Sequence, residues 1–290
     1  HLDYHGSMAE YGAAKRLLLL QPELAYAVIN FNDPEHEKWL LNISTKTSVV
    51  LYGQNISAAD MPIEHQYCVA NNLKYTTEGI ALMLQSSWGD CELRLSLLAE
   101  FNVANVLAAI CSQLCLGKNL KQIAYIVQKL KPVTGRMELY RRQGHATIVV
   151  DYAHTPDALE KALLAARRHC HGKLFCVFGC GGDRDVGKRS LMGEISEKLS
   201  DQVILTDDNV RSEDPQDILN DILAGCINPE HVLIEHDRKT AIKTAAAKSS
   251  AGDIILVAGK GHENYQIIGN QTLAYDERQF VALFQEGKTA

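Results

Sequence analysis

The sequence predicts an α/β protein with a mostly parallel sheet in its second half, and two observations support this fold class. After Pro132, five short apolar runs rich in β-branched residues alternate with segments of helical periodicity, as in βαβ units. Before Pro132, strand-like segments and turn signals lead into two successive helices. Because 290 residues suffice for about two domains, we expect a boundary near residues 132–136. The predicted domains are residues 1–132 and 133–290.

The first predicted domain begins with a helix over residues 7–20, with Ser7 as its N-cap. Alternating apolar residues and turn signals over residues 64–98 predict a small antiparallel meander. The remaining elements expected here are strands at 26–30 and 48–52 and helices at 34–43, 101–117 and 120–131. Pro132 ends the last helix, because the residue before a proline disfavours helical geometry.

The second predicted domain contains strands in five segments, namely 146–154, 173–182, 201–209, 231–237 and 252–263. Three of the intervening helices have clear start signals at Thr155, Asp214 and Asp237, where a capping side chain precedes a proline or a charged first turn. Gly269-Asn270 lies between two short apolar runs and predicts a hairpin turn.

Composition narrows the function classes. The net charge is −6 and the basic residues are scattered, which argues against a nucleic-acid-binding surface. Apolar runs are too short for a membrane span and no leader opens the chain, so we expect a cytoplasmic protein. The eight cysteines lie mostly in apolar segments without any C-x₂-C pair, which favours free core cysteines over a zinc site.

The stretch VFGCGGDRDVGKRS, residues 177–190, has the outline of a phosphate-binding loop. Gly182, Gly187 and Lys188 fit the G-x-x-x-x-G-K-[S/T] spacing, but Arg189 stands where the hydroxyl belongs, and two aspartates would repel a phosphate. A dinucleotide fingerprint is incomplete as well, because the glycines here give G-x-G-G rather than G-x-G-x-x-G. We therefore interpret this loop as part of a site for another kind of ligand.

Charged residues and glycines follow four predicted strands, at the position where open parallel sheets bind ligands. The four segments are Asp151–His154, Asp183–Asp185, Asp207–Arg211 and Gly259–Glu263. Each motif alone is also consistent with a turn, a helix cap or a surface ion pair. Together they suit a zwitterion, because guanidinium groups bind carboxylates in bidentate geometry and a carboxylate accepts an ammonium.

Eight sequence strings are closely similar to motifs of the Mur ligase family. They are DYAHTPDAL, VFGCGGDRDVGKR, TDDNVRSEDP and VAGKGHENYQ, preceded by HLDYHG, AAK, FNVANVLAA and GRME, and they cover essentially the whole chain. The resemblance implies three domains: one for a UDP-sugar, a central ATPase domain and a Rossmann-like C-terminal domain for an amino acid. It implies that residues 1–132 are the later part of the central domain and residues 133–290 the C-terminal domain.

The resemblance also implies a reaction. ATP phosphorylates the D-glutamyl carboxylate of UDP-N-acetylmuramoyl-L-alanyl-D-glutamate, and the amine of meso-diaminopimelate attacks the acyl phosphate to form an amide. It implies ATP and Mg²⁺ as cofactors and a role in peptidoglycan synthesis, and we expect a monomer. A lysine-adding relative, a folylpolyglutamate-type ligase and a non-catalytic amino-acid-binding module are the alternatives.

Two residues resemble the family's metal-binding groups. Lys15, in the motif AAK, resembles a carbamylated lysine whose carbamate helps to hold Mg²⁺, and His1 resembles a metal-binding histidine. Five others resemble its ATP contacts. They are Asn102 and Asn105 for adenine, and Arg136, Asp151 and His154 for the nucleotide and ribose.

The amino-acid contacts of the family correspond to Arg184, Asn209, Arg211, Gly259 and Glu263. In the family's D-N-P-R motif the arginine meets the carboxylate that diaminopimelate has and lysine lacks. Here the motif reads D-N-V-R, with Val210 in place of proline. Where the native backbone is compatible with proline, replacing it lowers stability by about 0.4–1 kcal/mol. We therefore expect the loop to be more flexible here, with the guanidinium of Arg211 still in place.

The family's phosphate-binding loop and UDP-sugar domain would precede His1. Of the Gly-Lys pairs in the chain, only Lys288-Thr289 supplies the hydroxyl, and it lacks the first glycine of the pattern. We therefore expect this polypeptide to be a fragment of the ligase that does not hydrolyse ATP productively by itself.

Overall fold

The computed structural model describes residues 8–41 and 43–288, which divide into two compact units. The first unit comprises the chain up to Lys74 together with Ile80–Leu95 and Glu100–Leu130. The second comprises the chain from Lys131 onward and two short earlier segments, Tyr75–Gly79 and Ser96–Ala99.

A mixed five-stranded sheet forms the centre of the first unit, in the order β1-β2-β3-β4-β5. Its strands are β1 (Tyr26–Asn30), β2 (Ser48–Gln54), β3 (Gln66–Thr76), β4 (Gly79–Ser86) and β5 (Cys91–Leu95). The first three run parallel, whereas β4 and β5 pair antiparallel. The expected meander corresponds to β3, β4 and β5, which follow one another in the chain and are neighbours in the sheet, while β3 also extends the parallel part.

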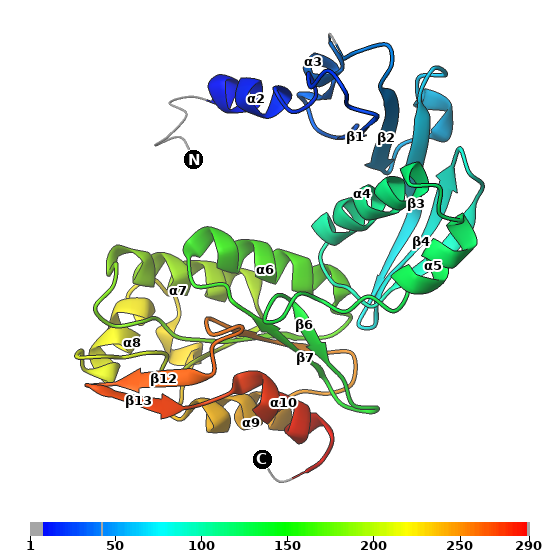
Figure 1. Ribbon diagram of the computed structural model, residues 1–290. Helices are drawn as coiled ribbons and strands as arrows, with labels where there is room; N and C mark the ends of the chain where they lie inside the picture. Colours follow the sequence, from blue (N-terminus) through cyan, green and yellow to red (C-terminus); the bar gives the residue numbers. More distant parts are fainter. Residues whose placement is uncertain (1–7, 42, 289–290) are drawn as a thin grey trace. The chain divides into compact units, whose positions relative to one another are not determined.

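The helices described in the first unit are α2 (Met8–Arg16), α3 (His36–Leu40), α4 (Phe101–Cys115) and α5 (Leu120–Val127), with a 3₁₀ turn, η1, at Ala58–Asp60. Figure 1 shows α4 and α5 beside the sheet. The apolar side of α4 packs on β1 and β2, and Asn119 caps α5 by accepting from the Lys121 amide at 2.9 Å.

The first helix is shorter than the 7–20 expected. It ends at Arg16, and residues 17–20 form turns with i to i+3 hydrogen bonds such as Leu20 N to Leu17 O at 3.3 Å. Pro22 follows these turns and disfavours helical geometry in the preceding residue, Gln21, so no helix continues past them. The predicted cap, Ser7, lies outside the residues that the structure describes.

A six-stranded sheet forms the centre of the second unit, in the order β10-β9-β8-β11-β7-β6. Its strands are β6 (Glu138–Tyr140), β7 (Thr147–Asp151), β8 (Leu174–Phe178), β9 (Gln202–Leu205), β10 (Leu233–Ile234) and β11 (Ile254–Ala258). Five of them are parallel, as the sequence predicts, and β6 adds an antiparallel edge. Since β11 inserts between β8 and β7, the carboxyl ends of β9, β8, β11 and β7 are neighbours.

Alternate residues of these strands face two separate cores. Val149, Cys176 and Leu256 belong to the core under α6 (Pro156–His169), α7 (Gly187–Leu199) and α8 (Pro215–Leu223). Val150, Val177 and Val257 belong to the core under α9 (Arg238–Lys248) and α10 (Glu277–Gln285). Figure 1 shows these helix groups on opposite faces of the sheet. The near-continuous apolar strands are those of a parallel sheet covered on both sides.

The predicted helix starts are confirmed by their capping bonds. Thr155 Oγ1, Asp214 Oδ1 and Asp237 Oδ1 accept from backbone amides two or three residues on, at 3.4, 2.8 and 2.8 Å. The predicted hairpin is also present as β12 (Tyr265–Ile268) and β13 (Gln271–Ala274), with Gly269-Asn270 at the turn. Between residues 8 and 288, Asn42 apart, no helix is long and apolar enough to cross a membrane.

Candidate functional site

A cavity of about 360 Å³ lies in the second unit where the four neighbouring strands end. Loops after β7, β8, β9 and β11 all contribute to it. Its lining residues are Tyr152, His154, Gly181, Arg184, Lys188, Asp208, Asn209, Arg211, Gly259, Glu263 and Tyr265. The structure thus brings together the five residues that sequence motifs assign to amino-acid binding, and His154 from the nucleotide set.

Glycines allow the loops after β8 and β9 to pack directly on each other. A Cβ atom at Gly179 would lie 1.9 Å from the Thr206 carbonyl oxygen, and one at Gly182 would lie 2.0 Å from the Val210 carbonyl oxygen. The Gly182 amide donates to the Asn209 carbonyl at 2.9 Å. These glycines are therefore explained by close backbone approach.

Side chains of the loop that resembles a phosphate-binding loop, in residues 177–190, form hydrogen bonds with other protein groups. Lys188 Nζ donates to the His154 carbonyl at 2.8 Å, and Asp185 Oδ1 accepts from the Gly187 amide at 2.9 Å. The Asp183 carboxylate accepts from the Ser212 hydroxyl at 2.7 Å, and this bond is the largest cause that lowers its pKa. Lys188 thus links this loop to the loop after β7, in agreement with the interpretation that it is not a phosphate-binding loop.

The two pocket arginines are held differently. Arg211 has a left-handed backbone, with φ of 51°, and its Nη1 donates to the carbonyls of Gly182 and Asn209 at 2.7 and 3.3 Å. Arg184 is exposed, and its Nη1 donates to the neighbouring Asp183 carbonyl at 3.1 Å. Arg211 is consequently a fixed cation, whereas Arg184 is anchored only within its own loop.

The amide of Asn209 is tightly bound. Its Nδ2 donates to Glu263 Oε2 at 2.9 Å, while its Oδ1 accepts from Lys260 Nζ and from the Ile267 amide, both at 3.0 Å. Lysine and amide nitrogens can only donate here, so they fix which end of the Asn209 amide faces them. The remaining proton of Nδ2 is left for a further acceptor.

Asp208 and Lys260 form a buried ion pair at the floor of the cavity. Lys260 is 0% exposed and its Nζ lies 3.2 Å from Asp208 Oδ1. Burial would raise the pKa of the Asp208 carboxyl, but the positive charges of Lys260 and Arg238 outweigh it and hold that pKa below its usual range. Sequence reasoning did not assign either residue a role, although both stand in strand-end motifs that it singled out.

A second ion pair lies beneath the first. Arg238, which is 1% exposed, binds the fully buried Glu277 through its Nε and donates to the Ala258 carbonyl through Nη2 at 2.6 Å. Tyr275 donates its hydroxyl to Glu277 at 3.1 Å. The last residue of β11 is therefore held by a buried charge, directly before the loop that carries Gly259 and Lys260.

Three residues of the predicted nucleotide set lie close together in the second unit. The guanidinium of Arg136 and the ring of His154 both lie against the ring of Tyr152, at 4.8 and 4.6 Å, and His262 joins them at 4.8 Å. Asp151 is 7% exposed and its two oxygens accept from the amides of Met137 and Ala153, each at 2.8 Å. Burial raises the pKa of Asp151, against the lowering effect of these amides.

The other predicted residues belong to the first unit. Asn102 and Asn105 lie in the first turns of α4, where Asn105 Nδ2 is 3.4 Å from Asn102 Oδ1. Lys15 is exposed on α2 with its Nζ 4.5 Å from the centre of the Tyr11 ring. His1 lies outside the residues that the structure describes.

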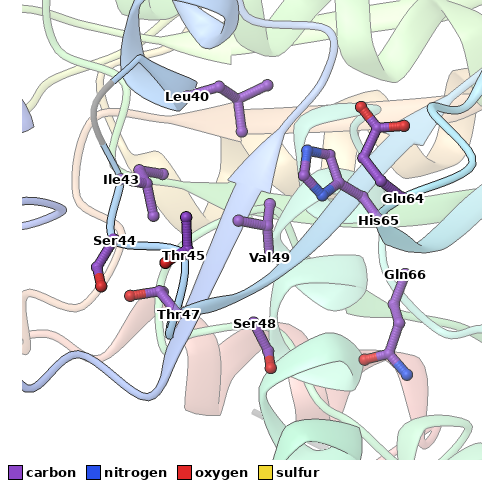
Figure 2. Close-up of a pocket in the computed structure, with 10 residues that line it drawn as sticks. All are labelled: Leu40, Ile43, Ser44, Thr45, Thr47, Ser48, Val49, Glu64, His65 and Gln66. Atoms are coloured by element: carbon purple, nitrogen blue, oxygen red, sulfur yellow. The ribbon is translucent and has the colours of Figure 1, made fainter.

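A separate cavity of about 500 Å³ lies at the amino ends of β2 and β3 in the first unit (Figure 2). It is lined by Leu40, Ile43, Ser44, Thr45, Thr47, Ser48, Val49, Glu64, His65 and Gln66. Hydroxyl groups predominate among its polar side chains, and Thr47 donates its own to the Leu24 carbonyl at 2.8 Å. None of the residues predicted from motifs lines this cavity.

Two family models match the chain. The model of the Mur ligase middle domain matches residues 1–113, and that of the Mur ligase glutamate ligase domain matches residues 135–261. The two matched segments lie on either side of residue 130, where the compact units divide.

A curated relative from Vibrio cholerae, UDP-N-acetylmuramoyl-L-alanyl-D-glutamate--2,6-diaminopimelate ligase, is 46% identical over 279 residues, which cover 96% of this chain and 55% of the relative. A solved structure with the same protein name is 38% identical, with a TM-score of 0.79, and covers 100% of this chain and 59% of that one. A MurF ligase from Thermotoga maritima in complex with ADP is 20% identical, with a TM-score of 0.59, over 89% of this chain and 55% of that one, and shows the fold alone. The chain thus spans just over half the length of these relatives.

Proposed function

Because the chain belongs to the Mur ligase family, we propose that the protein is an ATP-dependent ligase that joins meso-diaminopimelate to UDP-N-acetylmuramoyl-L-alanyl-D-glutamate. In this proposal, residues 1–132 belong to the central domain and residues 133–290 form the amino-acid-binding domain. The observation that supports it most strongly is the second-unit cavity, which joins two guanidinium groups and two carboxylates at one strand-end rim.

The cavity has the charges that a diaminopimelate end group requires. Arg184 and Arg211 supply guanidinium groups for a carboxylate, and Glu263 and Asp208 supply negative charge for an ammonium. Asn209 Nδ2 adds a neutral donor next to Glu263. Lysine has the same ammonium but lacks the second carboxylate, so Arg211 would lose its partner if lysine were bound.

The proposed nucleotide contacts are Asn102, Asn105, Arg136, Asp151 and His154. ATP supplies the phosphoryl group that activates the acceptor carboxylate. His154 contacts Tyr152 and also lines the amino-acid cavity, so a nucleotide bound by this cluster would lie beside the amino acid. Adjacent binding would favour reaction by holding both reactants in place.

For the metal, we propose Lys15 and His1. Lys15 is exposed, which suits reaction of its amine with carbon dioxide. A carbamate would supply the oxygen ligands that Mg²⁺ prefers. We also propose a cytoplasmic, monomeric protein, whose partners are the UDP-linked dipeptide and the amino acid.

Titration calorimetry with meso-diaminopimelate and L-lysine tests the proposal. We expect the 290-residue chain to bind diaminopimelate at least about tenfold more tightly, since a charge-assisted contact contributes about 1.5–3 kcal/mol. Arg211→Met should remove that preference, and Lys248→Met, at an exposed lysine of α9, should keep it.

Equal affinities of the unaltered chain for both amino acids would remove Arg211 as the selector. Tighter binding of lysine would favour a lysine-adding ligase instead. Binding of neither compound would contradict an amino-acid site in this cavity.

A further inference from the structure

Lys260 is a fully buried lysine whose ammonium has four oxygen neighbours. It donates to Asn209 Oδ1 and to the Tyr265 carbonyl, both at 3.0 Å. Its Nζ also lies 3.2 Å from Asp208 Oδ1 and 3.6 Å from Glu263 Oε2. An isolated buried ammonium is very costly, and these four oxygens compensate the burial of this one.

These neighbours belong to three different loops or strands. Asp208 and Asn209 follow β9, Glu263 follows β11, and Tyr265 begins β12. Lys260 therefore ties together the groups that form one side of the cavity. Its neighbours Gly259 and Gly261 allow this arrangement, since a Cβ at Gly259 would lie 2.7 Å from Asp208 Oδ2 and one at Gly261 would lie 2.8 Å from the Gly135 carbonyl oxygen.

Lys260 lies in a cluster of charged side chains. Its surroundings hold three carboxylates, Asp208, Glu263 and Glu277, against two cations, Lys260 and Arg238. The rings of Tyr265 and Tyr275 lie 6.0 and 5.9 Å from Lys260 Nζ. Glu263 is partly exposed to the cavity, at 16% of its side chain, so its carboxylate can accept from a ligand ammonium.

We propose that Lys260 is the positioning residue of the ammonium subsite. It fixes the Asn209 amide with Nδ2 toward Glu263 and keeps both groups aimed into the cavity, without touching the ligand itself. The inference rests on the proposed function for the identity of the ligand, because the ammonium of an amino acid is the cation that the exposed Glu263 carboxylate would bind.

The first experiment needs no ligand. Nuclear magnetic resonance of labelled protein follows hydrogen exchange of the Asn209 side-chain amide and the titration of the Asp208 carboxyl. In Lys260→Met we expect amide exchange at least about tenfold faster, since the Oδ1 of Asn209 loses one of its two donors. We also expect Asp208 to titrate at higher pH, because a neighbouring cation that favours its charged form is removed.

The second experiment separates positioning from mere stabilisation. Meso-diaminopimelate is compared with 2-aminopimelate, which keeps both carboxylates but lacks one ammonium. We expect the unaltered chain to prefer diaminopimelate by at least about tenfold and Lys260→Met to lose most of that preference. Lys248→Met should leave the ratio unchanged. Lys260→Gln, which retains a donor for Asn209, is the second variant if Lys260→Met does not fold.

Three results would overturn the inference or separate it from the proposed function. Equal weakening of both compounds in Lys260→Met would show a structural role only. Unchanged exchange of the Asn209 amide and an unchanged Asp208 titration would also overturn it. If the unaltered chain binds neither compound, the proposed function fails, and the resonance experiment alone decides whether Lys260 positions these groups.

Discussion

The carboxyl ends of the parallel strands differ in kind between the two units. In the first unit, amide side chains at the ends of β1 and β2 bind neighbouring backbone. Asn32 accepts from the Gln54 amide at 2.8 Å and donates to the Gln54 carbonyl at 3.1 Å, and Asn30 accepts from the Asn32 amide at 3.0 Å. In the second unit, charged side chains line a cavity at the corresponding ends.

The difference shows that a parallel sheet places loop residues together at the carboxyl ends of its strands. The types of these residues then determine what the site can bind. Asn32 and its neighbours complete the backbone hydrogen bonds of the loops, as turn residues commonly do. At the second-unit rim, Arg238 and Lys260 lie beneath the loops and compensate the carboxylates above them. Buried cations in the layer below the cavity are therefore what distinguishes the charged rim.

The largest expected effect comes from breaking the buried ion pair of the second unit. Arg238→Met leaves Glu277 buried without its cation, so we expect the free energy of unfolding to fall by about 3–5 kcal/mol. Urea denaturation followed by circular dichroism measures the change. Lys38→Met is the first-unit control, since its pair with Glu35 is exposed and contributes about 0–1 kcal/mol. If both variants lost a similar free energy of unfolding, a buried ion pair would not be what distinguishes the second unit from the first.

A pair of glycine substitutions should have effects of opposite sign. Gly179→Ala places a Cβ against the Thr206 carbonyl, and we expect a loss of about 1–3 kcal/mol and weaker diaminopimelate binding. Gly12→Ala lies inside α2, where a Cβ would lie at an ordinary contact distance of 3.6 Å from Glu35 Oε2, and should stabilise the protein by about 0.5–1 kcal/mol. Thermal unfolding of both variants measures the difference. If Gly179→Ala left the thermal stability unchanged, the two loops would be able to move apart without loss of stability.

The smallest effect is a pH dependence of stability. His169 is fully buried, with Nδ1 2.8 Å from the Thr76 carbonyl oxygen, and burial lowers its pKa below 6.5. The unfolded chain therefore takes up a proton first as the pH falls below about 6.5, so stability decreases until the lower folded pKa is reached.

Denaturation midpoints between pH 7.5 and 5 test this decrease. His169→Gln should flatten the curve over that range, because the buried titrating group is gone. His65→Gln, at the cavity of the first unit, should leave the slope in place. A slope that persists in His169→Gln would assign it to another group.

Local sequence signals predicted much of the fold. The caps at Thr155, Asp214 and Asp237 and the turn at Gly269-Asn270 depend on residues close in sequence, and all four are present. The short strand β6 was missed because three residues, ELY, give no measurable alternation. The insertion of β11 between β8 and β7 depends on contacts distant in sequence, so no local pattern predicts it.

The candidate site could be predicted only in part. Strand-end motifs correctly indicated which segments meet in one cavity, since the carboxyl ends of parallel strands share an edge. They did not indicate that Lys260 is buried or that Arg238 binds Glu277, because these pairs join residues far apart in the sequence. A charged residue in a motif is a candidate for the site. Whether its side chain is buried decides whether it contacts a ligand or supports another side chain.

The hairpin β12–β13 holds the backbone of Arg211 in place through two hydrogen bonds. The Arg211 amide donates to the Ile267 carbonyl at 3.1 Å, and the Gly269 amide donates to the Arg211 carbonyl at 2.7 Å. The segment with Arg211 is thus held in its left-handed conformation by a part of the chain more than 50 residues later. An engineer who transplants the D-N-V-R segment into a relative would move the guanidinium without its support. The smallest transferable module is that segment together with the hairpin.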